Sequence, residues 1–180
     1  MLRNMKVLVS AASGYGSTGE IAEAIGEELA KAGLDVNVVP PAEVTDLHGY
    51  DAVVLDSAVY TGHWLEPAET SADRFGPALV TRPVWLFSSG SVGDPTRKLV
   101  QKMDVDPVDL PPILEATHAR EHRMFAGKLH KTQMSFLQRA VLTVFRGMEG
   151  DFRDWQKIRA WASSIAEQLQ PRARGASPAA

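Results

Sequence analysis

Short apolar runs alternate with segments of helical periodicity along most of this chain. The apolar runs predict five strands, at Lys6–Ser10, Asp35–Val39, Asp51–Asp56, Pro83–Ser88 and Arg123–Ala126. The periodic segments predict helices at Thr18–Ala32, Pro67–Leu79 and Pro111–His118, with a short helix near Ala42–Leu47. Continuous apolar strands between helices favour a parallel sheet that is covered on both faces. We therefore expect an α/β domain with a doubly wound, five-stranded parallel sheet in the order 2-1-3-4-5.

The C-terminal part of the chain adds one helix to this plan. Apolar residues recur at helical spacing from Met134 to Phe145, between the last strand and a final helix that Asp151 would cap and that runs to about Leu169. The extra helix either packs on the domain or presents its apolar stripe to a membrane surface or a partner. Residues 171–180 read as a disordered tail, so the domain is expected to span residues 1–170.

The composition narrows the classes of function. A chain of 180 residues with 44% hydrophobic residues is long enough for one domain with a full core. It has no Cys, so it has no disulfide, thiol nucleophile or Cys-based metal site, and no His/Asp/Glu cluster has metal-ligand spacing. No segment approaches the roughly 18 apolar residues of a membrane span. We expect a cytoplasmic protein without a metal or a nucleic-acid partner, with peripheral contact at the inner face of the membrane if the extra helix is exposed.

The charges are unevenly placed along the chain. Residues 20–73 contain twelve acidic residues and one Lys, whereas residues 120–146 contain six Lys or Arg and one Glu. These stretches are either ordinary solvated helix faces, or an acidic rim together with a basic patch for an anionic partner.

The loop after the first strand carries the most specific signal. It consists of small, hydroxyl-bearing and Gly residues followed at once by a helix: Ser13, Gly14, Tyr15, Gly16, Ser17 and Thr18. The N–H groups at a helix N-terminus bind phosphate. The loop also fits G-x-G-x-x-G, but that motif requires an acidic residue at the far end of the second strand, and Asp35 lies at its beginning. The hydroxyls favour the terminal phosphate of a mononucleotide; a dinucleotide or a plain tight turn is the alternative.

Two more loops are expected at the same edge of the sheet, where ligands of open parallel sheets bind. Both are rich in Gly and hydroxyls and poor in charge; their candidate contacts are Ser57, Ala58, Val59, Tyr60, Thr61 and Gly62, and Ser88, Ser89, Gly90 and Ser91. A neutral slot beside a phosphate site suits an aromatic ring system. Tyr60 and Trp64 are candidates for stacking or for packing. His63 either handles a proton or is structural. No catalytic residue is assigned, and no Gly-x-Ser-x-Gly sequence supports a hydrolase.

The residues of the first loop resemble those of the flavodoxin family. Ser13, Gly16, Thr18 and Ala22 match its pattern, while Ala11 replaces the usual aromatic residue. The chain most resembles the subgroup of menaquinone-dependent protoporphyrinogen oxidases, through Thr18–Ala22, Tyr50–Asp51, Gly62–His63, Ala126–Gly127, the cationic extra helix and the Gly150…Trp155 entry to the last helix.

The resemblance implies a non-covalent FMN and electron transfer. The protein would oxidise an anionic porphyrinogen-like substrate and pass the electrons to a quinone, with Lys128, Lys131 and Arg139 on an anion-attracting face. The alternative is a flavodoxin-type electron carrier that docks with redox-partner proteins; a dinucleotide-binding reductase is the third hypothesis. Asp56 and Asp94 flank the expected slot, where they either lower the potential of FMN or are ordinary solvated or capping acids.

Overall fold

A parallel β-sheet forms the centre of the computed structural model, which describes residues 4–91, 106–129 and 150–170. Its strands are β1 (Lys6–Ala12), β2 (Asp35–Val39), β3 (Ala52–Tyr60), β5 (Val84–Ser91) and β6 (Glu121–Ala126). They lie in the order β2-β1-β3-β5-β6, which confirms the predicted order of the five long strands. The predicted helix at 134–146 and the predicted tail at 171–180 lie outside the described residues.

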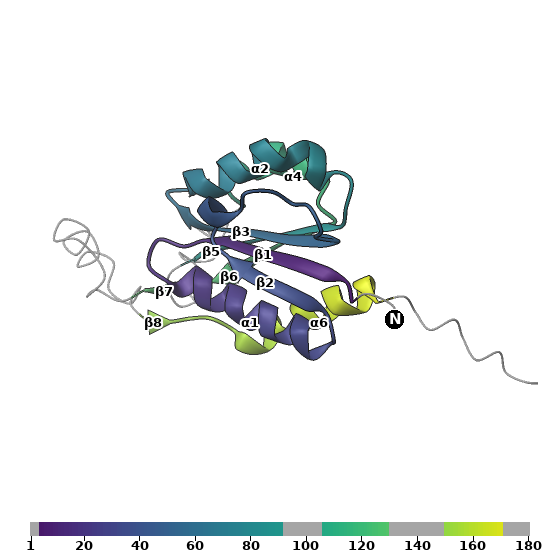
Figure 1. Ribbon diagram of the computed structural model, residues 1–180. Helices are drawn as coiled ribbons and strands as arrows, with labels where there is room; N and C mark the ends of the chain where they lie inside the picture. The colour runs from purple at the N-terminus through teal and green to yellow at the C-terminus, as the bar shows by residue number, and fades with distance from the viewer. Residues whose placement is uncertain (1–3, 92–105, 130–149, 171–180) are drawn as a thin grey trace, which may run out of the picture.

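Helices cover both faces of the sheet, as Figure 1 shows. On one face lie α1 (Ser17–Lys31) and α6 (Trp155–Leu169); on the other lie α2 (Glu66–Leu79), α4 (Leu110–Thr117) and the 3-10 turn η1 (Pro41–Glu43). Successive side chains of a strand point to opposite faces, so each central strand supplies both layers of the core. Val7 packs with the α1 and α6 layer, whereas the next residue, Leu8, packs with the α2 and α4 layer.

Aromatic side chains join the sheet to the last helix. Phe87 of β5, Phe125 of β6 and Trp161 of α6 are mutual neighbours, with ring centroids 5.6 to 5.8 Å apart and tilted or edge-on rings. Aromatic pairs in such geometries contribute about 0.5–1.5 kcal/mol each beyond the area that they bury. Four of the five residues predicted as the apolar stripe of the last helix are core: Ile158, Ala162, Ile165 and Leu169. The first, Trp155, is exposed.

Several predicted boundaries were wrong at the ends of the elements. β3 and β5 continue to Tyr60 and Ser91, because their parallel pairing extends through Ser57 and Ser88 into residues that look like a loop in sequence. The helix near Ala42–Leu47 is only the turn η1. The cap of α6 is Asp154, whose carboxylate accepts a hydrogen bond from the N–H of Lys157 at 3.1 Å, rather than Asp151.

Two short hairpins were not predicted. β4 (His63–Trp64) turns back antiparallel onto the end of β3, and β7 (Lys128–Leu129) pairs antiparallel with β8 (Gly150–Asp151). Two-residue strands are too short to show a period in sequence. Only the tertiary pairing defines them.

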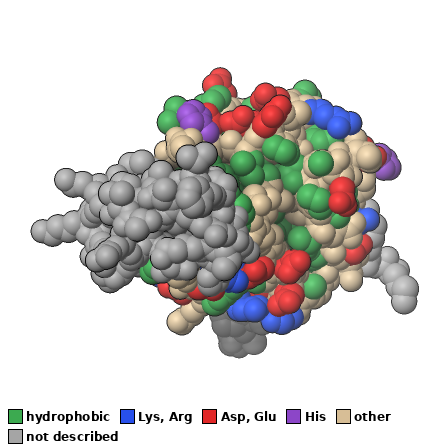
Figure 2. All heavy atoms as spheres, turned by 90° about the vertical axis from the view of Figure 1, so that its left-hand side faces the viewer, with side chains coloured by type: hydrophobic (Ala, Val, Ile, Leu, Met, Phe, Trp, Pro, Cys, Tyr) green, Lys and Arg blue, Asp and Glu red, His purple; other side chains and the backbone are tan. Residues whose placement is uncertain are grey.

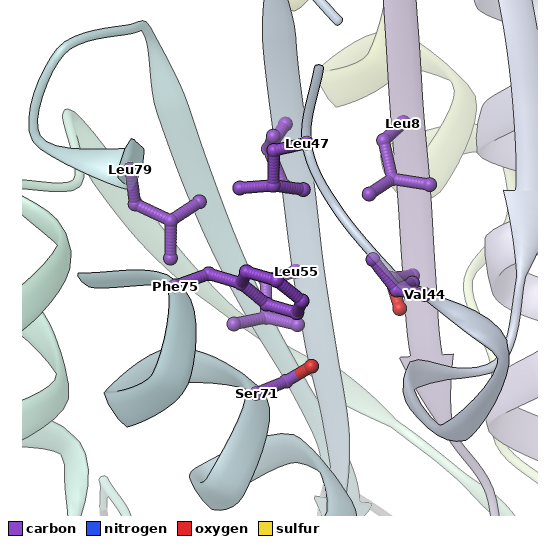
Figure 3. Close-up of a pocket in the computed structure, with 9 residues that line it drawn as sticks. Leu8, Val44, Leu47, Leu55, Ser71, Phe75 and Leu79 are labelled. Carbon is purple, nitrogen blue, oxygen red and sulfur yellow. The ribbon is translucent and has the colours of Figure 1, made fainter. Parts of the chain in front are cut away.

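A small cavity lies in the core beneath α2, between β1, β3 and the segment that follows β2 (Figure 3). Apolar side chains dominate its lining, which consists of Leu8, Ser10, Val44, Leu47, Val53, Leu55, Ser71, Phe75 and Leu79. The hydroxyl of Ser10 is buried there without a hydrogen-bond partner within the described part of the chain. Among the described residues, no helix is long and apolar enough to cross a membrane, and no group of three His, Asp or Glu side chains could hold a metal ion.

Candidate functional site

The loop between β1 and α1 forms an open anion site. Gly16, the residue before α1, has a left-handed backbone with φ of 85°, a conformation that favours Gly. No side chain caps α1; instead the Ser13 hydroxyl accepts a hydrogen bond from the N–H of Gly16 at 2.9 Å. The N–H groups of the first helical turn are thus left for a ligand, and they attract negative charge. This geometry fits a terminal phosphate.

The loop hydroxyls have different surroundings. Thr18 is buried, and its hydroxyl is hydrogen bonded to that of Ser89 on β5 at 2.7 Å. The hydroxyl of Ser17 accepts a hydrogen bond from the N–H of Lys128 at 3.1 Å, so its hydrogen remains available to a phosphate oxygen. Ser13 and Ser17 therefore suit direct phosphate contact better than Thr18, which fixes the start of α1 to the sheet.

Tyr60, at the end of β3, closes over the phosphate loop. A Cβ atom on Gly14 would lie 2.7 Å from the Tyr60 hydroxyl, so the loop and this ring are in close contact at residue 14. The rings of Tyr15 and Tyr60 meet edge-on, with centroids 5.9 Å apart. Burial, together with the neighbouring Tyr15, raises the pKa of Tyr60 to about 12, so its hydroxyl stays protonated at neutral pH. Tyr60 remains 37% exposed, which leaves one side of its ring for a ligand.

The turn from β3 to β4 has an unusual backbone. Thr61 and Gly62 both have positive φ, 51° and 85°. A β-branched residue such as Thr61 pays a conformational penalty there, and strained residues of this kind cluster at ligand sites. The segment before α4 holds this turn in place, because the N–H of Val108 donates to the carbonyl of Gly62 at 2.8 Å.

Besides Thr18, four of the sequence-predicted contacts have buried side chains. They are Ser57, Ala58, Ser88 and Ser89, which lie within paired strands. The Ser57 hydroxyl donates to the carbonyl of Ala58 and accepts from the N–H of Leu65, so it is used within the protein. Gly90 packs tightly against Val59: a Cβ on Gly90 would lie 2.8 Å from the Val59 carbonyl oxygen. The side chain of Ser91 lies outside the described residues.

Trp64 packs in the core. Its side chain is only 4% exposed, and its indole N–H donates to the Ser88 hydroxyl at 2.8 Å. Of the two roles considered for this residue, the structure shows packing, and stacking on a ligand is wrong.

His63, in contrast, is exposed, and Asp109 orients it. The Nδ1 atom of His63 lies 2.9 Å from the carboxylate of Asp109, which also accepts from the Trp64 N–H at 2.9 Å. Partial burial opposes ionisation of Asp109, but these hydrogen bonds outweigh it and lower its pKa. This anchor could not be predicted from sequence, because 46 residues separate the two partners.

Asp56 is neither a solvated nor a capping acid. Its side chain is fully buried, and neither carboxyl oxygen has a hydrogen-bond partner within the described part of the chain. Burial raises the pKa of Asp56 well above its ordinary value. Burial thus favours the uncharged form of this acid, and a role of Asp56 in lowering the FMN potential stays a prediction. Asp94 lies outside the described residues.

The described members of the basic stretch are individually paired and do not form one patch. Arg120 stacks on Trp85. Arg123 pairs with its neighbour Glu121, and the Lys128 ammonium lies 3.6 Å from Glu20 at the start of α1. Lys131 and Arg139 lie outside the described residues. On the described part of the face shown in Figure 2, acidic side chains lie above, below and to the right of hydrophobic and neutral surface, and the Lys and Arg side chains lie at the rim.

A doubly wound parallel sheet whose first strand is followed by an uncapped helix N-terminus is the arrangement expected of a flavodoxin-like domain. The comparisons agree: the family model of the flavodoxin domain matches residues 8–156. The chain therefore belongs to the flavodoxin domain family, and its cofactor is FMN, as predicted.

Solved structures confirm the fold. A flavodoxin from the domain Archaea is 18% identical with a TM-score of 0.58, covering 91% of this chain and 98% of that one. Oxidised flavodoxin 2 from Bacillus cereus is 20% identical with a TM-score of 0.58, over 91% and 99% of the two chains. Rubredoxin oxygen:oxidoreductase from Desulfovibrio gigas is 13% identical with a TM-score of 0.59, but only 36% of its chain is covered. No curated protein matches the sequence. These likenesses do not support the finer resemblance to protoporphyrinogen oxidases.

Proposed function

We propose that this protein is an FMN-dependent electron carrier that exchanges electrons with a redox-partner protein. One observation carries the proposal: the uncapped N-terminus of α1 opens beside a neutral, aromatic-walled edge of the sheet. FMN supplies the one- and two-electron redox chemistry when bound, and the chain supplies binding, orientation and electrostatics.

Different residues at this edge of the sheet would bind different parts of FMN. The first-turn N–H groups of α1 and the hydroxyls of Ser13 and Ser17 would hold the phosphate. Tyr60 and the turn at Thr61 and Gly62 would border the flavin ring on one side, and the end of β5 at Gly90 would border it on the other. Because the ring edges need hydrogen bonds and the faces need apolar cover, neutral loops suit this ring better than charged ones.

The charge distribution favours a protein partner over a small anionic substrate. Acidic side chains surround the edge that would hold the flavin, whereas the described Lys and Arg side chains are paired or lie at the rim (Figure 2). A negative rim repels a porphyrinogen carboxylate and attracts a partner with a basic docking face.

Porphyrinogen oxidation coupled to quinone reduction is the second candidate. It is favoured by the antiparallel pairing of β7 with β8, which places Leu129 opposite Gly150. The N–H of Lys128 on β7 donates to the Ser17 hydroxyl, so this pair of strands lies beside the phosphate loop. Peripheral membrane contact belongs to this candidate alone. Quinone-dependent turnover of a porphyrinogen by the FMN-loaded protein would place it first.

Binding of three flavins tests the cofactor site. We expect FMN to bind more tightly than riboflavin and FAD, because the α1 site suits a terminal phosphate. Ser17→Ala should weaken FMN by about tenfold or more, since a hydrogen bond to a charged group contributes about 1.5–3 kcal/mol, and should leave riboflavin nearly unaffected. Ser164→Ala, on α6, is the matched control.

Equal affinity for FMN and riboflavin would contradict the assigned phosphate site. The carrier function is tested separately, by stopped-flow electron exchange between the reduced protein and a small one-electron acceptor. Rapid exchange without porphyrinogen turnover supports the carrier. Slow exchange together with turnover would overturn it.

A further inference from the structure

A series of polar contacts between side chains lies beneath the proposed flavin site and joins four segments of the protein. The Trp64 indole N–H on β4 donates to the Ser88 hydroxyl on β5 at 2.8 Å. The Ser88 hydroxyl lies 2.9 Å from Nε2 of His122 on β6. Nδ1 of His122 lies 3.5 Å from a carboxylate oxygen of Asp106, just before α4.

The direction of these contacts follows from giving each buried polar hydrogen an acceptor. An indole N–H only donates, so the Ser88 oxygen accepts from Trp64. The hydrogen of the Ser88 hydroxyl is then free to point at Nε2 of His122, which accepts it. The proton of a neutral His122 lies on Nδ1 and faces Asp106. Only neutral His122 completes this order, because a protonated imidazole has no acceptor nitrogen.

The order Ser, His, Asp resembles a hydrolase triad, but this arrangement does not form a nucleophile. The Ser88 side chain is fully buried and already accepts from Trp64, so no substrate reaches its oxygen. These contacts instead hold β4, β5, β6 and the segment before α4 in position relative to one another.

We propose that neutral His122 is a positioning residue for the FMN site, holding the turn at Thr61 and Gly62 and the segment before α4 in register with β5. The inference rests on the proposed function. Trp64 follows that turn directly, and Asp106 leads into Val108, whose N–H holds the Gly62 carbonyl. Loss of the contact at Nε2 would therefore loosen the turn from two sides.

The charged groups around His122 make this contact sensitive to pH. Burial lowers the pKa of His122, and the nearby Asp106 carboxylate opposes this. From the segment before α4, Asp109 also approaches, but its carboxylate binds His63 of β4. Asp106 is thus the charged group that acts on the imidazole.

The other charged neighbours of His122 are paired with groups other than its imidazole. Glu121 and Arg123, beside His122 on β6, pair with each other, and Glu121 also accepts from Trp161 of α6, on the opposite face of the sheet. On β5, Ser88 and Leu86 are uncharged. Protonation, which the lowered pKa of His122 moves to a more acidic pH than for a free imidazole, would turn Nε2 from an acceptor into a donor and disrupt this series of hydrogen bonds.

FMN affinity measured against pH tests the proposal. Dissociation constants would be measured by quenching of FMN fluorescence from pH 8 to pH 4.5, for wild type, His122→Gln and His122→Leu. We expect wild-type affinity to fall with acidification, by at most tenfold per pH unit for one linked proton. His122→Gln keeps an acceptor for Ser88 but does not titrate, so it should keep most of the affinity and lose this part of the pH dependence. His122→Leu should bind weakly at every pH.

The exposed His48, in the loop before β3, provides the matched control: His48→Gln should follow the wild type. The pH dependence of the FMN phosphate is common to all variants and cancels in the comparison. The circular dichroism of the bound flavin should change with pH in wild type and not in His122→Gln.

A His122→Gln profile that superimposes on the wild type would overturn the positioning role, even if His122→Leu fails to fold. Failure of the wild type to bind FMN at any pH would overturn the proposed function and this inference together. Tight FMN binding with identical profiles would overturn the inference alone.

Discussion

Asp56 should make the protein less stable as the pH rises. Its carboxyl group lies in the core between β1 and β5, with no exposed surface and with no hydrogen-bond partner for either oxygen among the described residues. Burial raises its pKa, so the folded protein keeps this proton at pH values where the unfolded chain, with an Asp pKa near 3.9, has released it.

The linkage relation gives the sign and the size of the effect. Below pH 4 both states hold the proton, and Asp56 costs nothing electrostatically. Above it, the folded state binds one more proton than the unfolded state, so the free energy of unfolding falls by about 1.4 kcal/mol for each pH unit, until the folded acid ionises as well. Asp56→Asn has nearly the same shape and no charge. It should match the wild type near pH 4 and become progressively more stable than it above that pH.

Urea unfolding at a series of pH values, followed by Trp fluorescence at a fixed excess of FMN, measures this difference. Subtracting the two proteins removes the contribution of all other titrating groups. Asp73→Asn, an exposed acid on α2, is the control and should show no divergence. Parallel stability curves for wild type and Asp56→Asn would refute the argument, because an acid that ionises normally in the fold contributes no such slope.

Three other substitutions test the packing around the candidate site. Arg153 is 3% exposed and bonds both Asp151 and Glu20, so Arg153→Leu should lower the free energy of unfolding by about 1.5–3 kcal/mol in urea titrations; an unchanged value would contradict the anchoring of β8 to α1. Gly90→Ala places a Cβ against the backbone of Val59 and should cost about 1–3 kcal/mol in the same assay. Gly14→Ala should cost less, because its Cβ meets only the movable end of Tyr60; equal costs would refute this distinction.

The candidate site was predicted in part. The strand, turn and helix around the candidate phosphate loop from Ser13 to Thr18 were predicted from sequence, because β1, a Gly-rich turn and α1 follow one another directly between residues 6 and 31. Phosphate binding by this loop stays a prediction. The roles of Trp64 and Ser88 could not be read, because they depend on a hydrogen bond between residues on different strands. Composition alone made the end of β5 look like a loop, whereas pairing with β3 makes it a strand.

The sequence by itself determined the class of fold, the strand order and the kind of cofactor. These depend on local signals: apolar runs, helical periodicity and the turn chemistry of one loop. The tertiary structure alone decided which polar groups face the ligand and which are buried. Asp56 looked like an acid at the edge of the site, and the sheet places it in the core, where burial raises its pKa. His122 looked like part of a basic stretch, and the strand pairing of β5 with β6 brings it to Ser88. Protonation and hydrogen bonding depend on neighbours in space, and those neighbours are set by the packing of segments distant in the chain.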